Sequence, residues 1–309
     1  MDFSLEIPAN LWLFPRGIKR TGGTGNNTIE WTSKYGSVST SSWDIAVSDG
    51  MNELGLNANL LWLVATQYPE FDKSGQTRKG LAVSLWAQYA LDNFSTVAEA
   101  VAHFRKEEFV VVSDNIPGTD KFVTVHLSLS DATGDNAILE YIGGKLVIHH
   151  DPSYVVMTND PTYEEQLAVY NYWKDIPGNI FLPGTNRAAD RFARATYYIN
   201  AIPQTDNNRV AVASTLSVVR QCSVPYGIST EGFPNLSTTR WRIVADQKNK
   251  VYYFEDALSP NTIWVDMKKL DFNAKTGRVK KLELDKNQIY AGESSAKFNL
   301  AKPFKFLGV

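Results

Sequence analysis

The order of the periodic segments constrains the fold of this chain most, because sets of short strands alternate with sets of helices. Between residues 29 and 68, apolar or alternating segments are separated by Gly and Asn, as in successive antiparallel strands. Leu81, Leu85 and Tyr89 then fall at helical spacing. Thr96, followed by a glutamate at the capping-box spacing, predicts the start of a second helix.

A second set of strands is expected from Phe109 onward. It includes the run AILEYI-GG-KLVIHH, in which Gly143-Gly144 separates two apolar segments as the turn of a β-hairpin does. The C-terminal third returns to strand patterns in TTRWRIVAD, KVYYFED and TIWVDM.

Three helices are expected between these two regions. Asp160-Pro161 supplies an N-cap and a first-turn proline for a helix through Trp173. Another spans about 187–200, and a third carries apolar residues at helical spacing before Pro225 ends it.

This order predicts an α+β protein. Strand sets that alternate with helix pairs, without regular βαβ spacing, indicate antiparallel sheets covered by helical layers rather than a doubly wound parallel sheet. No linker, low-complexity tract or repeat divides the chain, so residues 1–309 are interpreted as a single domain.

Charge and composition exclude several classes of function. The formal net charge of -2, without a basic stripe, argues against a nucleic-acid partner. No run of 18 apolar residues is present, so no membrane partner is expected. One cysteine and four histidines without HExxH spacing offer no metal site, and no cofactor is expected. The 8 Trp and 14 Tyr suggest large aromatic contact areas, in the core or around an apolar ligand.

The single Cys222 leaves one hydrolase hypothesis open. A Cys-His enzyme needs an imidazole close to the thiol in space, and His126, His149 and His150 lie on predicted strands from which this could be met. A free cysteine is more often a small apolar residue of the core, and that structural interpretation is favoured.

A scattered set of polar residues is the other candidate for a site. Asp2, Asn159, Asn186, Arg191 and Arg240 each have an ordinary explanation when taken alone. Asn159 could shape the turn before a helix, and an arginine beside Trp could be a surface cation stacked on a ring.

The wording and order of the motifs change this assessment. The segments NELGL, HLSLSD, VMTNDPTYEEQL, LPGTNRAADRFARA, SVPYG and TTRW occur together, and the chain resembles the choloylglycine hydrolase and penicillin V acylase family, most closely its Gram-negative branch. The resemblance runs from Met1 to the C-terminus. It implies an N-terminal-nucleophile hydrolase with an αββα four-layer sandwich of two antiparallel sheets between helical layers. Members of this family cleave linear amide bonds with a cysteine at the mature N-terminus, whose own α-amine activates the thiol.

The resemblance also implies roles for five residues. Asp2 matches the carboxylate that holds the amine of the nucleophile, and Phe3 replaces a tryptophan beside it. Asn159 matches the asparagine that donates to the oxyanion, and Arg240 the arginine that organises the surroundings of the nucleophile. Trp62 takes the position whose backbone N–H completes the oxyanion hole, and its indole would form an apolar wall for the acyl group.

Two other matched motifs are interpreted as structural. In LPGTNRAADRFARA, Arg191 and Arg194 are expected to pair with carboxylates, and SVPYG is expected to end a helix. Neither motif is assigned to the chemistry.

The chain departs from the family pattern at its start. The two opening strands of the family, roughly 20 residues that carry the cysteine, have no counterpart before Asp2. The chain as given is therefore expected to be N-terminally truncated relative to the family and inactive. We favour a start at an internal Met over a homologue that lost its nucleophile. Periplasmic or secreted localisation is expected if a longer form carries a signal peptide, and cytoplasmic localisation if Met1 is the true start.

The expected function is hydrolysis of a small-molecule acyl amide. Conjugated bile salts, penicillin V and N-acyl homoserine lactones are the substrates that the resemblance suggests, and a homotetramer is the assembly that it suggests. The alternative is a catalytically silent ligand-binding homologue that keeps the acyl pocket around Phe3 and Trp62.

Overall fold

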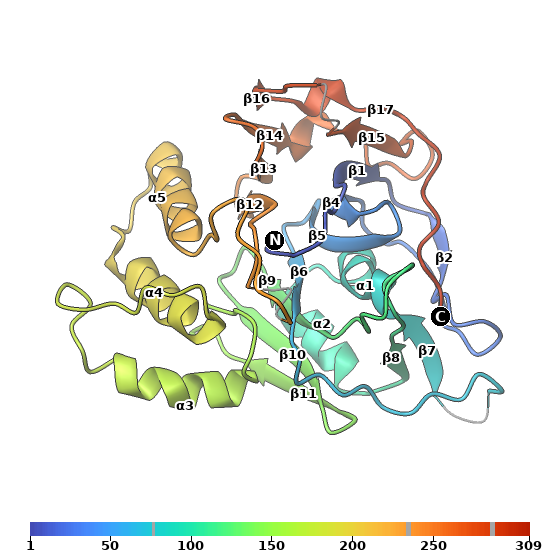
Figure 1. Cartoon of the computed structure of the whole chain (residues 1–309). Coiled ribbons are helices and arrows are strands. Elements are labelled where there is room, and N and C mark those ends of the chain that lie inside the picture. Colours follow the sequence, from blue (N-terminus) through green and yellow to red (C-terminus); the bar gives the residue numbers. More distant parts are fainter. Residues whose placement is uncertain (76–77, 233–235, 285–287) are drawn as a thin grey trace.

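The computed structural model describes residues 1–75, 78–232, 236–284 and 288–309. Within these ranges the helices fall into two groups on opposite sides of the strands (Figure 1). The first group is α1 (Trp86–Asn93) and α2 (Val97–Phe104). The second is α3 (Tyr163–Trp173), α4 (Ala188–Ala201) and α5 (Asn208–Gln221). Short 3-10 turns are Val83–Leu85, Met267–Lys269 and Ser295–Lys297.

The larger sheet of the described chain has nine strands, each antiparallel to its neighbours. Their spatial order is β11 (Lys145–His150), β10 (Asn136–Ile142), β9 (Val125–Ser130), β6 (Asn57–Trp62), β5 (Ala46–Asn52), β4 (Ser37–Ser42), β1 (Asn10–Phe14), β15 (Lys280–Glu283) and β17 (Asn299–Leu300). The hairpin predicted at Gly143-Gly144 joins β10 to β11. Both glycines have positive φ, as the tight turn requires.

The second sheet packs against this one and is smaller. It consists of β12 (Trp241–Asp246), β13 (Val251–Asp256), β14 (Thr262–Asp266) and β16 (Gly292–Glu293), with β12 at its edge. Two further pairs are β2 (Lys19–Thr21) with β3 (Glu30–Thr32), and β7 (Lys79–Ala82) with β8 (Phe109–Val112).

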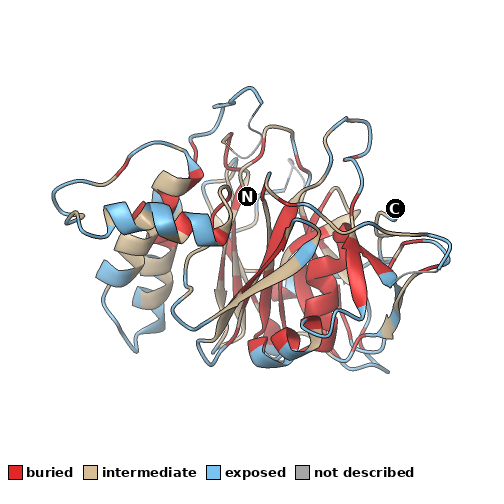
Figure 2. Cartoon of the chain, turned by 90° about the horizontal axis from the view of Figure 1, so that it is seen from below, coloured by how far each residue is buried: buried red, intermediate tan, exposed pale blue. Residues whose placement is uncertain are grey.

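The layers follow from which face of each strand is apolar. On β9, Val125, Leu127 and Leu129 belong to the core under α1 and α2, whereas His126, Ser128 and Ser130 alternate with them on the opposite face. Helix α1 is buried along its whole length, whereas α3–α5 show mostly intermediate and exposed surface (Figure 2). A second core between the sheets joins Met51 of β5 to Tyr252 and Phe254 of β13.

The second helical group closes the other side of the molecule. Ile138 of β10 packs against Tyr163 of α3 and Phe192 of α4, and α5 contacts β12. The arrangement is the expected α+β sandwich of two sheets between helical layers.

Two local predictions were wrong in their details. Leu81 lies in strand β7, paired in parallel with β8, and α1 begins only at Trp86. Asp160 does not cap α3, because its carboxylate accepts the backbone N–H groups of residues 64 and 65 at 3.0 and 3.1 Å. Thr162 caps that helix instead, in a capping box with the glutamate of the first turn.

The first residues lie in the interior, beside the line of β12 (Figure 1). Asp2 forms an antiparallel bridge with Thr239, and Arg240 N donates to Met1 O at 2.8 Å. The Met1 amine donates to Trp241 O at 2.8 Å. In the described residues no helix is long and apolar enough to cross a membrane.

Candidate functional site

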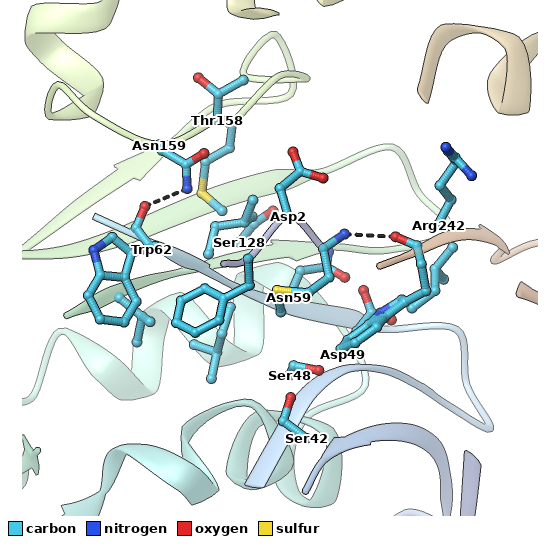
Figure 3. A pocket seen from close by; sticks show the side chains of 18 of the residues that line it. Asp2, Ser42, Ser48, Asp49, Asn59, Trp62, Ser128, Thr158, Asn159 and Arg242 are labelled. Atoms are coloured by element: carbon cyan, nitrogen blue, oxygen red, sulfur yellow. Dashed lines mark hydrogen bonds between the residues drawn. The ribbon is translucent and has the colours of Figure 1, made fainter. Parts of the chain in front are cut away.

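A cavity of about 590 Å³ lies between the two sheets and the second helical group. Its walls come from residues 1–3, the strands β5, β6, β9 and β12, the segment 154–159, and the facing sides of α4 and α5. Figure 3 shows polar side chains from several of these elements turned toward its interior. Segments far apart in the sequence therefore contribute to one site.

Four groups form a continuous chain of contacts at one end of the cavity. Arg191 Nη1 lies 3.5 Å from Asp2 Oδ2, and Arg191 Nη2 donates to Asn159 Oδ1 at 2.6 Å. Asn159 Nδ2 donates to the backbone O of Trp62 at 2.7 Å (Figure 3). The second N–H of the Asn159 amide remains able to donate to a ligand oxygen, since a primary amide carries two.

Burial shifts the pKa values of two basic groups at this end of the cavity, Arg191 and the Met1 amine. Arg191 is 5% exposed, and burial lowers its pKa while the charge of Asp2 opposes that shift. Asp2 also accepts from Thr239 Oγ1 at 2.5 Å, so its carboxylate is held on two sides. Desolvation lowers the pKa of the Met1 amine, against the charges of Asp2 and Asp49. A larger fraction of an amine in this position is thereby neutral near pH 7 and able to accept a proton.

Aromatic rings form an adjacent wall. The ring of Phe3, 5% exposed, lies 5.7 Å from that of Trp62 and 6.4 Å from that of Trp43, centroid to centroid. Ile116 and Val123 continue the apolar lining. This wall suits an apolar or aromatic group of a ligand.

The cavity also has a polar floor, formed by Asp49, Asn57 and Asn59. Asp49 accepts a hydrogen bond from Tyr252 Oη, which also contacts Thr40 Oγ1 at 2.8 Å. Burial raises the pKa of Asp49 to about 7, although the Tyr252 bond and the Met1 amine oppose the shift. Asn57 is 6% exposed and donates to Asn59 Oδ1 at 3.0 Å, but its own Oδ1 has no hydrogen-bond partner among the described residues.

The structure brings together four of the five residues that the sequence suggested. Asp2, Phe3, Trp62 and Asn159 all line the cavity. Trp62 meets Asn159 through its carbonyl oxygen.

Arg240 lies outside this group. Its guanidinium donates to the backbone O of Phe3 at 3.1 Å and of Ser4 at 3.2 Å, and it stacks over the ring of Tyr226. Arg240 therefore holds the N-terminal segment through the backbone carbonyls of Phe3 and Ser4.

Arg191 lies between Asp2 and Asn159 in the chain of contacts, a position that the sequence interpretation did not assign. Pairing of Arg191 with a carboxylate was expected, but not its position beside Asn159. The available signal was its place on α4, where it shares the buried face with Ala188 and Phe192. Arg194, by contrast, binds only backbone carbonyls, those of residues 183, 185 and 221.

Cys222 also lines the cavity, at the end of α5. Its Sγ contacts Arg191 O at 3.6 Å, and burial raises the pKa of the thiol. None of the described residues that line the cavity is a histidine, so no imidazole is placed to activate this thiol. Nor do three His, Cys, Asp or Glu side chains gather as metal ligands anywhere in the described ranges.

Comparison with known proteins adds independent information. The sequence profile described as linear amide C-N hydrolases, choloylglycine hydrolase family, matches residues 1–280. Penicillin V acylase of Pectobacterium atrosepticum is 47% identical over 328 aligned positions, covering 100% of this chain and 87% of the relative.

Solved structures agree with this match. Penicillin V acylase from Agrobacterium tumefaciens superposes with a TM-score of 0.93 at 53% identity, over 100% of this chain and 94% of the other. A variant of conjugated bile acid hydrolase from Clostridium perfringens has the same fold, with a TM-score of 0.77 at 21% identity over 93% of this chain and 92% of the other.

Proposed function

The chain belongs to the choloylglycine hydrolase family of linear amide C–N hydrolases, and from this premise we propose that its cavity binds an N-acyl amide such as penicillin V. The scissile carbonyl would lie beside Asn159, and the acyl group against Phe3 and Trp62. The observation that carries the proposal is the contact chain from Asp2 through Arg191 and Asn159 to the Trp62 carbonyl.

Each member of this chain has a definable task in amide cleavage. Arg191 holds Asn159 Oδ1, which fixes the plane of the amide and directs its free N–H into the cavity. A fixed N–H donor stabilises the oxyanion that forms when a nucleophile attacks the carbonyl carbon. Asp2 lies next to the amine position at the head of the chain, where a negative charge favours the protonated amine that follows proton transfer from a thiol.

The aromatic wall supports the choice of acyl group. Penicillin V carries a phenoxyacetyl group, whose ring matches the apolar lining around Phe3, Trp43 and Trp62. Conjugated bile salts and N-acyl homoserine lactones present apolar acyl groups as well. They are the competing substrates of the same reaction class.

We further propose that the nucleophile is an N-terminal cysteine absent from the described cavity, and that the chain as given binds acyl amides without cleaving them. Two observations support this. The buried Cys222 thiol has a raised pKa and no imidazole partner. The outer edge of β12 continues along the cavity wall beyond the bridge of Asp2 to Thr239, where a strand carrying a cysteine could pair. A silent binding homologue is the alternative that fits the same observations.

In the proposed reaction the cysteine thiol passes its proton to the α-amine, and the resulting thiolate bonds to the acyl carbon. The C–N bond breaks and the leaving amine takes up a proton. Water then cleaves the thioester, which releases the acid and restores the thiol.

The test uses the 309-residue chain with penicillin V. Calorimetry should show binding, and chromatography should show no release of phenoxyacetic acid. The matched variant Trp62→Ala should weaken binding about tenfold, because it removes one of the three rings of the aromatic wall.

Other outcomes decide between the parts of the proposal. Absence of binding by the unmodified chain would exclude penicillin V as a ligand. Hydrolysis that Cys222→Ala abolishes would identify Cys222 as the nucleophile, and hydrolysis that survives Cys222→Ala would require a different one. Reading the gene upstream of Met1 distinguishes an in-frame cysteine from a stop codon, which would leave the silent homologue.

A further inference from the structure

A buried histidine and glutamate lie directly behind the segment that carries Asn159. His126 on β9 is 1% exposed and Glu140 on β10 is 0% exposed. His126 Nδ1 lies 2.9 Å from Glu140 Oε1, and His126 Nε2 lies 2.8 Å from the backbone O of Thr158, directly before Asn159 in the chain. Both ring nitrogens therefore face acceptors.

This geometry defines the protonation of the ring. A carbonyl oxygen only accepts, and an ionised carboxylate only accepts, so both bonds form only when both ring nitrogens carry a proton. A neutral ring would point one lone pair at an oxygen, at a site that is buried from solvent. The Glu140 carboxylate supplies the negative charge that a buried imidazolium needs.

Glu140 holds the other side of the same segment. Its two oxygens accept from Tyr163 N at 3.2 and 3.0 Å, at the first residue of α3, and His149 Nε2 lies 3.3 Å from its Oε2. Burial raises the pKa of Glu140, but the bonds from His126, His149 and Tyr163 outweigh it and bring the pKa to about 2. The carboxylate is ionised at every pH at which the protein would act.

The held segment connects directly to the proposed oxyanion site. Thr158 Oγ1 donates to Ala188 O at 3.1 Å, at the start of α4, which carries Arg191 one turn later. The carbonyl of Thr158 is thus fixed by His126 while its side chain is fixed by α4. The Asn159 amide, which follows, is fixed by Arg191 and Trp62 O.

We propose that His126 is a positioning residue for Asn159, acting as a doubly protonated imidazolium between Glu140 and the Thr158 carbonyl. This inference rests on the proposed function only in that Asn159 is taken to bind the substrate carbonyl. Loss of one proton from His126 breaks one of its two bonds, releases the Thr158 carbonyl and lets the Asn159 amide move. Recognition of the substrate carbonyl is therefore lost when this ring is deprotonated.

The charged and titratable groups around the ring are few. Glu140 faces it from β10 and His149 lies behind Glu140 on β11. The Tyr163 phenol, against His149, has its pKa raised by burial and stays neutral. From β6 the residue opposite His126 is Leu61. On the far side of Asn159 stand Arg191 and Asp2.

The test is a pH titration of the 309-residue chain followed by ¹H–¹⁵N correlation spectra of the histidine rings and of the Asn159 side-chain amide. Both nitrogens of His126 should carry protons at pH 7, because both face acceptors. The Asn159 amide signals should move with the same midpoint as the His126 ring. A ring with one protonated nitrogen at pH 7, or Asn159 signals that ignore the ring, overturns the proposal.

Two variants test whether the positioning role of His126 affects ligand binding. His126→Gln can satisfy only one of the two acceptors with its amide donor, so affinity for penicillin V should fall about tenfold and lose any pH dependence that follows the His126 ring. The matched control is His150→Gln, because His150 also lies on a strand and bonds a carboxylate, that of Asp135, but is remote from Asn159. Its affinity and pH profile should follow the unmodified chain.

The outcomes separate this proposal from the proposed function. If the unmodified chain does not bind penicillin V, the proposed ligand is wrong, while the ring and amide spectra still decide the role of His126. If His126→Gln does not fold, the titration of the unmodified chain decides alone. A folded His126→Gln with unchanged affinity and pH profile overturns the positioning role.

Discussion

Glu140 on β10 and Asp49 on β5 are carboxylates of the same sheet, yet the protein shifts their pKa values in opposite directions, to about 2 and about 7. Burial raises both. At Glu140, hydrogen bonds from two histidines and a backbone N–H outweigh the effect of burial on the pKa. At Asp49, the hydrogen bond from the Tyr252 phenol and the charge of the Met1 amine do not outweigh it. The Glu140 carboxylate is therefore stabilised in its ionised form by its partners, and the Asp49 carboxylate is not.

The difference shows what each region is for. A buried network in which every member has a partner fixes one geometry, which is what a positioning element for Asn159 needs. The floor with Asp49 and the unpaired Asn57 Oδ1 carries hydrogen-bonding capacity that the described protein does not use. Such capacity faces the cavity, where a ligand or a further strand could take it up.

The largest effect is expected from Glu140→Ala. Removal of this carboxylate leaves the His126 ring and the Tyr163 N–H buried without their acceptor, so the free energy of unfolding should fall by about 3–5 kcal/mol. Urea denaturation at pH 7 measures it. The control Asp135→Ala removes the half-exposed partner of His150 and should cost at most about 1 kcal/mol.

The acid branch of the stability curve checks the same carboxylate without a substitution. The pKa of Glu140 is lowered from 4.5 to about 2 by folding, so its contribution is fully present above 4.5 and is lost as the pH falls toward 2. The loss should amount to about 3 kcal/mol. Equal cost for Glu140→Ala and Asp135→Ala would remove the contrast on which the comparison rests.

A stabilising effect is expected from Asp49→Asn. Folding raises the pKa of Asp49 from 3.8 to about 7, so the folded state binds the proton more tightly and stability falls as the pH rises from about 4 to about 7. Asparagine mimics the protonated form. The free energy of unfolding at pH 8 should rise by roughly 2 kcal/mol, discounted for water in the cavity, and stay unchanged at pH 4. Destabilisation at pH 8 would mean that Tyr252 and the Met1 amine hold an ionised carboxylate after all.

The smallest effect is expected from Asn57→Ala. This residue makes one side-chain bond, to Asn59, so its loss should change the free energy of unfolding by no more than about 1 kcal/mol. Asn52→Ala is the matched control on the neighbouring strand, where the amide makes bonds to residues 54, 56, 91 and 94. If both substitutions lower the free energy of unfolding equally, the polar groups of the floor are as well satisfied as those elsewhere in the sheet.

Local chemistry made part of this structure predictable. Gly143-Gly144 and Thr96 act on their immediate neighbours, and the structure confirms the hairpin and the helix start that they predicted. Leu81 was misassigned because a helical spacing does not reveal that β8, further along the chain, offers a parallel partner. Asp160 was misassigned because its carboxylate bonds to residues 64 and 65, far away in sequence.

The sequence pointed to four residues that line the cavity, but not to the position of Arg191 beside Asn159. The resemblance to a family pointed to Asp2, Phe3, Trp62 and Asn159, which line one cavity. It assigned Arg240 to the surroundings of the nucleophile and interpreted Arg191 as structural, although both arginines lie in matching motifs. What separates them is the partner, since Arg191 bonds Asn159 while Arg240 bonds backbone carbonyls.

The bond from the Met1 amine to Trp241 O has a consequence for the order of assembly. The two residues are 240 positions apart, so this wall of the cavity cannot close until the residues between them have been made. At roughly 5–20 residues per second, the first residues wait on the order of ten to fifty seconds beside a growing chain. During that interval Phe3 lacks its burial, so an apolar side chain of the cavity wall stays exposed until β12 has been made.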